Sequence, residues 1–167
     1  MLAVGSTRSM NDAIPEGARP VARVLLVGPG KKLLLLHAEH AADGHRLWLT
    51  PGGGLEKYES FEDATRRELR EETGLEIGVV GPWVWTRRHA YSWNGRWCDQ
   101  YERFFVATTD NERIRPRSRD DYVIGHRWWR VGDLGISRED FVPRRLAALV
   151  GHIIEGRYPD EPIDCGV

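Results

Sequence analysis

Three glutamates at helical spacing, Glu68, Glu71 and Glu72, are the residues best arranged to do chemistry. Ser60 before them is a favourable N-cap and Gly74 after them is a favourable left-handed helix end, so the segment predicts one helix. At about 100° per residue, Glu68 and Glu72 lie ~40° apart, and Glu71 lies ~60° beyond Glu68. Like charges on one face repel each other, but a divalent cation would reverse that interaction. Mg²⁺ is commonly held by one or two carboxylates plus waters and substrate phosphates, so the spacing favours a metal-dependent reaction on a phosphate compound.

A solvated charged face is the simpler interpretation of these glutamates, because Arg66, Arg67 and Arg70 can pair with them within the helix. The residues in front of the helix favour the metal site. Pro51 is followed by three consecutive glycines, which is more than a plain strand-to-helix turn requires. Glycine lets a backbone present carbonyl oxygens and lets a pyrophosphate approach closely. We therefore expect a metal-binding loop at this point.

The wider stretch has a defined register: Gly53, five residues, Glu59, seven residues, and then Arg67-Glu68-Leu69-Arg70-Glu71-Glu72-Thr73-Gly74-Leu75. From Gly53 to Leu75 it resembles the Nudix box at every defined position, and the resemblance extends in order over roughly Arg19 to Leu134. It implies an α/β fold, specifically an α/β/α sandwich with a mixed β-sheet. It also implies Mg²⁺-dependent hydrolysis, with Mn²⁺ as a substitute, of a phosphoanhydride bond in a nucleoside diphosphate linked to another group.

The same resemblance assigns roles within the box. Four residues are expected to hold the metal through the Gly52 carbonyl and the carboxylates of Glu68, Glu71 and Glu72. The three glutamates are also the expected catalytic residues, and Glu71 could orient the attacking water instead of binding the metal. Arg67 and Glu59 are expected to form a structural ion pair that ties the loop to the helix.

A further acid is expected outside the box, because some Nudix enzymes take an additional ligand or catalytic base from beyond it. No fixed motif marks that position. We favour Glu102 as this catalytic residue, followed by Asp120 or Asp121. The alternative class is a nucleotide-sensing module that keeps the fold without catalysis, and the complete set of box glutamates argues against it.

Aromatic and basic residues after the box are candidates for substrate recognition. Trp85 could stack on a nucleobase, and Arg87 could meet a phosphate or carboxylate with its guanidinium fork. Core packing is the commoner fate of a tryptophan such as Trp85, and a solvated loop explains Arg87 equally well. The same stretch also contains Trp83, Tyr91, Trp93 and Trp97. The substrate stays open among ADP-ribose, an oxidised nucleoside triphosphate, a dinucleoside polyphosphate and a sugar nucleotide.

Charge and composition limit the class of partner. The 24 Lys and Arg residues against 25 Asp and Glu residues leave a net charge of −1, which gives no positive field to hold a nucleic acid polymer. A small-molecule nucleotide is the expected partner. The longest aliphatic run, Leu33 to Leu36, is far shorter than the ~20 residues of a membrane span. Cys98 and Cys165 indicate thiols and a reducing cytoplasm, and a homodimer is compatible with the sequence.

The 167 residues fit one domain. We expect a flexible lead-in over 1–18, in which Met10 is an alternative start, the Nudix domain over 19–158 and a tail over 159–167. Helices should cover both faces of the sheet. The expected strands lie at 21–27, 33–37, 77–87, 100–108 and 127–131, and the expected helices at 61–73 and 141–154.

Overall fold

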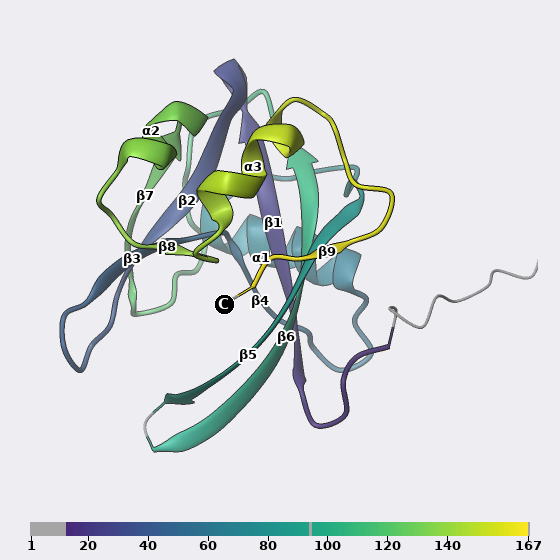
Figure 1. Ribbon diagram of the computed structural model, residues 1–167, viewed down its shortest axis with the longest axis vertical. Helices are drawn as coiled ribbons and strands as arrows, with labels where there is room; N and C mark the ends of the chain where they lie inside the picture. The colour runs from purple at the N-terminus through teal and green to yellow at the C-terminus, as the bar shows by residue number, and fades with distance from the viewer. Residues whose placement is uncertain (1–12, 94, 167) are drawn as a thin grey trace, which may run out of the picture.

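A nine-stranded sheet forms the centre of the computed structural model, which describes residues 13–93 and 95–166 (Figure 1). Its strands neighbour one another in the order β8-β3-β2-β1-β6-β5-β9, while β4 pairs with β1 and β7 with β2. The strands are β1 (Arg19–Gly28), β2 (Lys32–Glu39), β3 (Arg46–Leu49), β4 (Gly52–Gly54), β5 (Trp83–Trp93), β6 (Arg96–Thr108), β7 (Val123–Trp129), β8 (Phe141–Val142) and β9 (Ile163–Asp164). Because β1 runs antiparallel to β2 and parallel to β6, the sheet is mixed.

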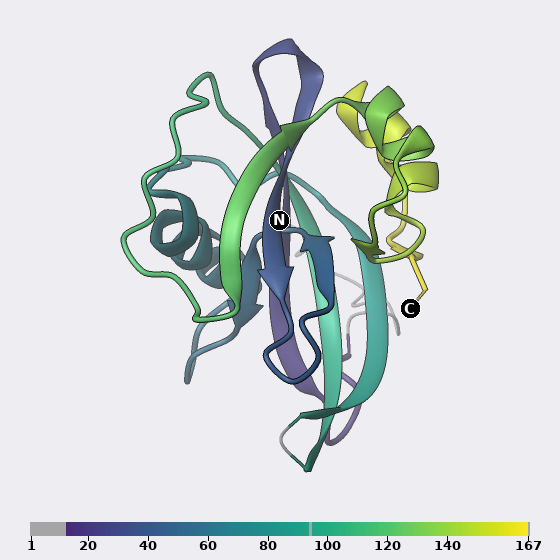
Figure 2. The ribbon, with the colours of Figure 1, turned by 90° about the vertical axis from the view of Figure 1, so that its left-hand side faces the viewer.

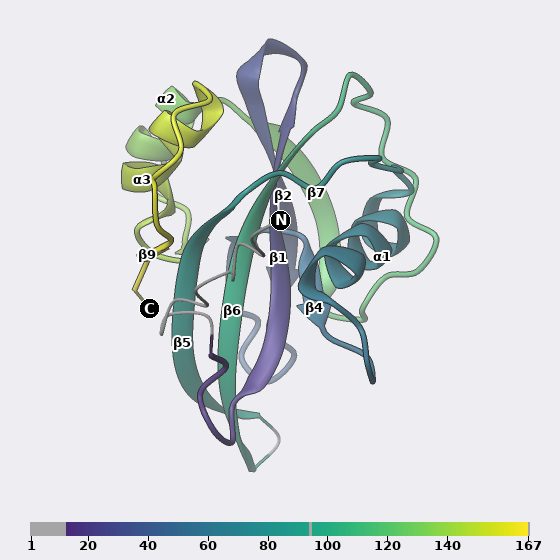
Figure 3. The same ribbon diagram turned by 90° about the vertical axis from the view of Figure 1, so that its right-hand side faces the viewer.

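Helices cover both faces of this sheet. Helix α1 (Phe61–Thr73) packs on one face, whereas α2 (Val131–Ile136) and α3 (Leu146–Ile154) pack on the other, as the two side views show (Figures 2 and 3). A short 3-10 turn, η2 (Pro29–Lys31), joins β1 to β2. This arrangement confirms the expected α/β/α sandwich with a mixed sheet.

Strand β1 lies between the two helical layers, which explains its apolar sequence. Val24 and Leu26 pack in the cluster that contains Leu69 of α1, whereas Leu25 packs in the cluster that contains Leu146 of α3. Successive side chains of a strand point to opposite faces, so a strand covered on both faces is apolar at nearly every position. The strand predicted from this apolar run is confirmed.

Helix α1 begins and ends where its capping residues predict. The hydroxyl of Ser60 accepts a hydrogen bond from the backbone N–H of Asp63 at 3.1 Å. At the other end Gly74 adopts a φ of 75°, and its N–H donates to the carbonyl of Arg70 at 2.9 Å. These bonds satisfy backbone groups that a helix end leaves unpaired, and the helix predicted over 61–73 is confirmed.

The strand expected over 77–87 is displaced toward the C-terminus. Leu75 and Ile77 pack in the apolar cluster under α1, so the residues that suggested a strand belong to the connection that follows the helix. Strand β5 begins at Trp83 and continues to Trp93, and it pairs with β6 along this length to form a long hairpin (Figure 1).

The helix expected over 141–154 is split. Phe141 and Val142 form β8 and pair with β3, and α3 begins only at Leu146. Pro143 stands between these elements and has no N–H to donate, so neither the strand nor the helix runs through it.

The chain ends also differ in part from expectation. The tail returns to the sheet as β9 beside β5, because the edge of β5 offers backbone groups that the tail can satisfy. Cys165, which follows β9, is fully buried. Most of the expected lead-in, residues 1–12 with Met10, lies outside the described residues. Of the helices described, none is long and apolar enough to cross a membrane.

Candidate active site

The three glycines before α1 form strand β4 and not the expected loop. Gly53 pairs with Ala22 of β1, and Gly52 pairs with Arg23. Gly52 has a φ of 140°, and a Cβ added there would lie 2.1 Å from the carbonyl oxygen of Ala22. A Cβ added at Gly53 would lie 2.4 Å from a carboxylate oxygen of Glu68. The position of Gly52 therefore requires glycine, whereas a side chain at Gly53 would displace the carboxylate of Glu68. The backbone of β4 thus lies against the carboxylates of α1.

Glu72 joins α1 to this strand. The residue is buried, and its Oε2 accepts a hydrogen bond from the N–H of Gly52 at 2.8 Å. Burial raises the pKa of Glu72 to about 8, against the opposing effects of the Gly52 hydrogen bond and the charge of Arg23. This carboxylate therefore contacts the residue whose carbonyl was expected to bind the metal.

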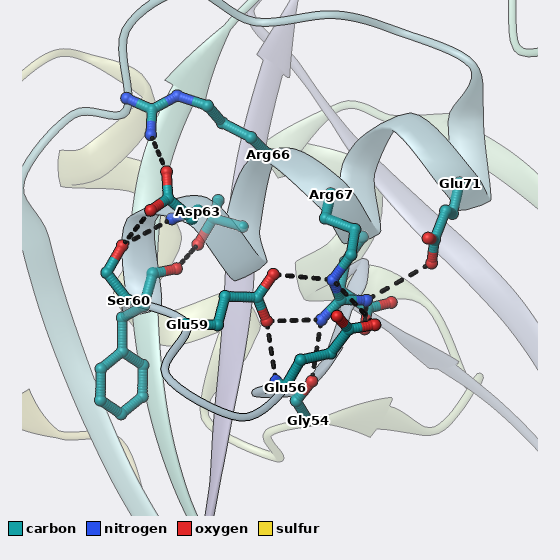
Figure 4. Close-up of polar contacts among 11 residues, drawn as sticks. Gly54, Glu56, Glu59, Ser60, Asp63, Arg66, Arg67 and Glu71 are labelled. Atoms are coloured by element: carbon teal, nitrogen blue, oxygen red, sulfur yellow. Dashed lines mark hydrogen bonds and ion pairs between the residues drawn. The ribbon is translucent and has the colours of Figure 1, made fainter.

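Arg67 organises the other carboxylates of the box (Figure 4). Its Nε and Nη2 donate to Glu59 at 2.8 and 2.9 Å, so the expected ion pair is present, and it lowers the pKa of Glu59. Nη2 also donates to the carbonyl of Gly54 at 2.9 Å, which ties β4 to the helix. Nη1 donates to Glu68 at 2.7 Å and to Glu71 at 3.4 Å. Arg67 thus holds Glu59 and two of the three helix glutamates, as its position within the helix allowed.

Asp120 is an acid outside the box that approaches the helix glutamates. The connection between β6 and β7 docks on the end of α1, where the N–H of Ser118 donates to the carbonyl of Glu71 at 3.0 Å. The charge of Asp120 helps to raise the pKa of both Glu68 and Glu72, after the larger effect of their burial. Sequence reasoning placed Asp120 second because no local signal shows where a long connection docks.

Glu102, the favoured acid outside the box, is fully buried between two arginines. Its Oε1 accepts from Nε and Nη2 of Arg23, both at 3.2 Å, and its Oε2 accepts from Nε of Arg87 at 2.6 Å. Burial alone would raise the pKa of Glu102, but the charges of Arg23 and Arg87 outweigh it and lower that pKa. Arg23 Nη1 also donates to the carbonyls of Gly52 at 3.1 Å and Thr50 at 3.4 Å. The structure therefore argues against the expected catalytic role of Glu102, because both of its oxygens accept hydrogen bonds from arginines inside the fold.

The two expected substrate contacts, Trp85 and Arg87, are buried as well. The ring of Trp85 packs on Phe104 with a centroid distance of 5.8 Å, inside the cluster beneath α3. Arg87 is only 4% exposed and is held by Glu102. Neither side chain offers a face on which a base or phosphate could rest, so this expectation is corrected in favour of packing. Strand alternation places residues 85 and 87 on the same covered face.

The remaining sequence candidates are scattered. The guanidinium of Arg103 lies 4.0 Å above the ring of Trp83, and Tyr91 stacks on His89. Trp97 is 75% exposed on the hairpin, and the side chain of Trp93 lies outside the described residues. The two cysteines are free thiols, as expected.

The donors at the junction of β4 and α1 fit a hard cation. The carboxylate of Glu72 is bonded to the backbone of Gly52, and Gly53 leaves room beside it for the carboxylate of Glu68. The carbonyl of Gly52, the expected third donor, accepts a hydrogen bond from Arg23 at 3.1 Å. Within the part of the chain that the structure describes, no three acidic, histidine or cysteine side chains form a ready-made metal cage. Mg²⁺ does not need one, since it usually keeps waters and binds one or two carboxylates together with substrate phosphates. The residues present therefore fit Mg²⁺ that binds together with a phosphate compound.

Comparisons with known proteins point to one family. The family model described as NUDIX domain matches residues 17–150. The chain is 27% identical to an RNA pyrophosphohydrolase of Sphingopyxis alaskensis over 161 residues, or 87% of this chain and 95% of that protein. It is 54% identical to the nucleoside triphosphatase NudI of an Enterobacter species over 39 residues, which span 22% of this chain and 28% of that protein. A crystal structure of a MutT NUDIX hydrolase from Burkholderia pseudomallei shares the fold with a TM-score of 0.62 at 22% identity, over 79% of this chain and 96% of that chain. Because the family model matches most of its length, the chain belongs to the NUDIX hydrolase family.

Proposed function

We propose that this NUDIX hydrolase uses Mg²⁺ to cleave the phosphoanhydride bond of a small nucleotide in which a nucleoside diphosphate is linked to another group. The family makes the chain a pyrophosphohydrolase; the metal, the residue roles and the substrate are the proposal. One observation carries it. The buried carboxylate of Glu72 is bonded to Gly52, and the carboxylate of Glu68 lies against Gly53, so hard oxygen donors converge at a backbone free of side chains.

In this proposal Glu68, Glu72 and the carbonyl of Gly52 hold the metal, and Glu71 is a further ligand or orients the attacking water. Bound Mg²⁺, or Mn²⁺ in its place, would polarise the phosphoryl oxygens and neutralise charge that develops on them. Arg67 keeps Glu68 and Glu71 in position through its hydrogen bonds of 2.7 and 3.4 Å.

Asp120 replaces Glu102 in the proposal as the acid from outside the box. Its charge already acts on Glu68 and Glu72, and its side chain is exposed. An exposed carboxylate whose charge reaches the proposed metal ligands can accept a proton from water or bind a cation, whereas Glu102 accepts hydrogen bonds from arginines on both sides.

The substrate is proposed to be a small nucleotide because the net charge of −1 provides no field for a long polyanion. The name of the Sphingopyxis relative adds the 5′ end of an RNA as the competing candidate. A screen decides between them. Each test compound is incubated with Mg²⁺, and its products are separated and identified by chromatography. The compounds are nucleoside triphosphates and their oxidised forms, ADP-ribose, a dinucleoside polyphosphate, a sugar nucleotide and a 5′-triphosphorylated RNA.

We expect turnover of a small nucleotide that leaves phosphate on both products, because water attacks within a phosphoanhydride. EDTA should abolish turnover, and Ca²⁺ should lower it because the larger ion coordinates more loosely. Release of free nucleoside, or full activity in EDTA, would contradict the mechanism. Absence of turnover on every substrate would instead favour the alternative class, a nucleotide-sensing module without catalysis.

A further inference from the structure

Tyr58 has an unusual conformation for a tyrosine. It lies in the connection between β4 and α1, and it is 93% exposed. Its φ of 65° is in the left-handed region, which side chains other than those of glycine and asparagine rarely adopt. The N–H of Glu59 donates to the carbonyl of Glu56 at 3.1 Å, so Tyr58 is the third residue of a β-turn. Glycine and asparagine are favoured at that position when φ is positive.

Neither packing nor backbone preference explains a tyrosine there. The ring is almost entirely in solvent, so it contributes little to the core, and the backbone would be less strained with glycine or asparagine. An exposed aromatic ring in a strained conformation points instead to a contact that forms with a ligand. The ammonium of Lys57 lies 4.8 Å from the centroid of this ring, so the turn presents a cation together with an aromatic face.

The turn is anchored to the candidate active site on both sides of Tyr58. The N–H of Glu56 donates to the carboxylate of Glu59 at 2.8 Å, and that carboxylate is bonded to Arg67 at 2.8 Å. Arg67 in turn contacts Glu68 of the proposed metal site at 2.7 Å. A chain of short polar contacts therefore links the turn of Tyr58 to Glu68 of the proposed metal site.

We propose that Lys57 and Tyr58 form a contact site for the nucleobase of the substrate, with the base stacked on the ring of Tyr58. Every base has a π-face, so stacking on one aromatic ring tolerates different bases, and the lysine adds attraction for an anionic ligand. This inference rests on the proposed function, because it places the base of the same nucleotide whose phosphates bind at Glu68 and Glu72.

The test compares Tyr58→Asn with Tyr58→Phe. Asparagine accepts a positive φ but has no ring, whereas phenylalanine keeps the ring. For each of ATP, GTP and ADP-ribose that the wild type hydrolyses, Tyr58→Asn should raise KM about fivefold or more and leave kcat within twofold, since base stacking is worth at least that ratio. Tyr58→Phe should restore the wild-type KM.

Two further measurements separate stacking from a structural effect. The Tm of Tyr58→Asn should equal or exceed that of the wild type, because the strain is relieved while little packing is lost. Inorganic triphosphate, which has no base, should inhibit both proteins with the same Ki. The matched control is Tyr158→Asn, in which a tyrosine that is 42% exposed and follows α3 is changed without effect on KM.

An unchanged KM in Tyr58→Asn, with an active wild type, would overturn this inference alone. An equal rise in the Ki of inorganic triphosphate would overturn it too, because the turn would then contact phosphate and not the base. A wild-type protein without turnover on any nucleotide of the screen would refute the proposed function and this inference with it.

Discussion

Replacing Glu102 by glutamine separates a residue that organises the site from one that takes part in the chemistry. Glutamine keeps the size of the side chain and one acceptor oxygen, but it removes the negative charge between Arg23 and Arg87. In the wild type these arginines donate to Glu102 at 3.2 and 2.6 Å, and the carboxylate is fully buried. The variant would leave two guanidiniums around a single neutral acceptor.

The cost follows from this burial. Removing one partner of a buried ion pair destabilises a protein by about 3–5 kcal/mol. The side chain of Arg23 keeps 15% of its exposure, which allows some hydration, and glutamine still accepts one hydrogen bond. We therefore expect the lower end, about 3 kcal/mol. At roughly 2–4 °C per kcal/mol for a chain of this length, Tm should fall by about 6–12 °C.

Thermal unfolding followed by circular dichroism measures this shift, with Asp99→Asn as the matched control on the same strand. Asp99 pairs with Arg88 at 2.7 Å, but the two side chains are 24% and 53% exposed. A surface pair contributes about 0–1 kcal/mol, so the control should change Tm by no more than about 4 °C. Below its Tm, Glu102→Gln should keep kcat within about tenfold of wild type at saturating Mg²⁺. It should need more Mg²⁺ for half-maximal activity, because Arg23 loses its anchor beside the carbonyl of Gly52.

A Glu102→Gln protein that melts like the control but has lost turnover by 10²-fold or more would refute this reasoning. Such a result would mean that Glu102 acts in the reaction despite the two arginines around it.

Three further predictions concern the box. Glu72→Gln should lower turnover by at least ~10²-fold, and its Tm in EDTA should be nearly that of the wild type. Added Mg²⁺ should raise the Tm of the wild type more than that of the variant. A variant with wild-type turnover at saturating Mg²⁺ would show that Glu72 is not a metal ligand. Gly53→Ala should lower kcat by about 10- to 100-fold in a steady-state assay, because the new Cβ would lie 2.4 Å from a Glu68 oxygen and must displace it. An unaffected kcat would show that the reaction does not depend on the position of Glu68. Arg67→Ala should lower the free energy of unfolding at neutral pH. The folded-state pKa of Glu59 is lowered, so its contribution is complete above the ordinary glutamate pKa of about 4.3 and is lost as pH falls through the folded-state value. Urea unfolding at a series of pH values should show the gap between wild type and Arg67→Ala narrowing below about pH 4.5, and a gap that widens there would contradict the ion pair.

Local signals in the sequence determined the elements whose stabilising contacts are close along the chain. The bounds of α1 follow from Ser60 and Gly74, because a helix end is satisfied by residues within one turn of it. The shared face of Glu68 and Glu72 follows from helix geometry alone. The apolar run of β1 indicated a strand covered on both faces, as the structure shows. The register of the box indicated the family, which the comparisons confirm.

Only the tertiary structure decided what surrounds each candidate residue. Glu102 meets Arg23, which is 79 residues away in the chain, because β1 and β6 pair in parallel, and no local pattern encodes that register. The approach of Asp120 depends on where the connection before β7 docks, and the tail becomes β9 because the edge of β5 is open to it. The sequence alone does not show whether a given carboxylate is buried or exposed. The neighbours brought by long-range strand pairing decide whether such a group is neutralised inside the fold or left free to react.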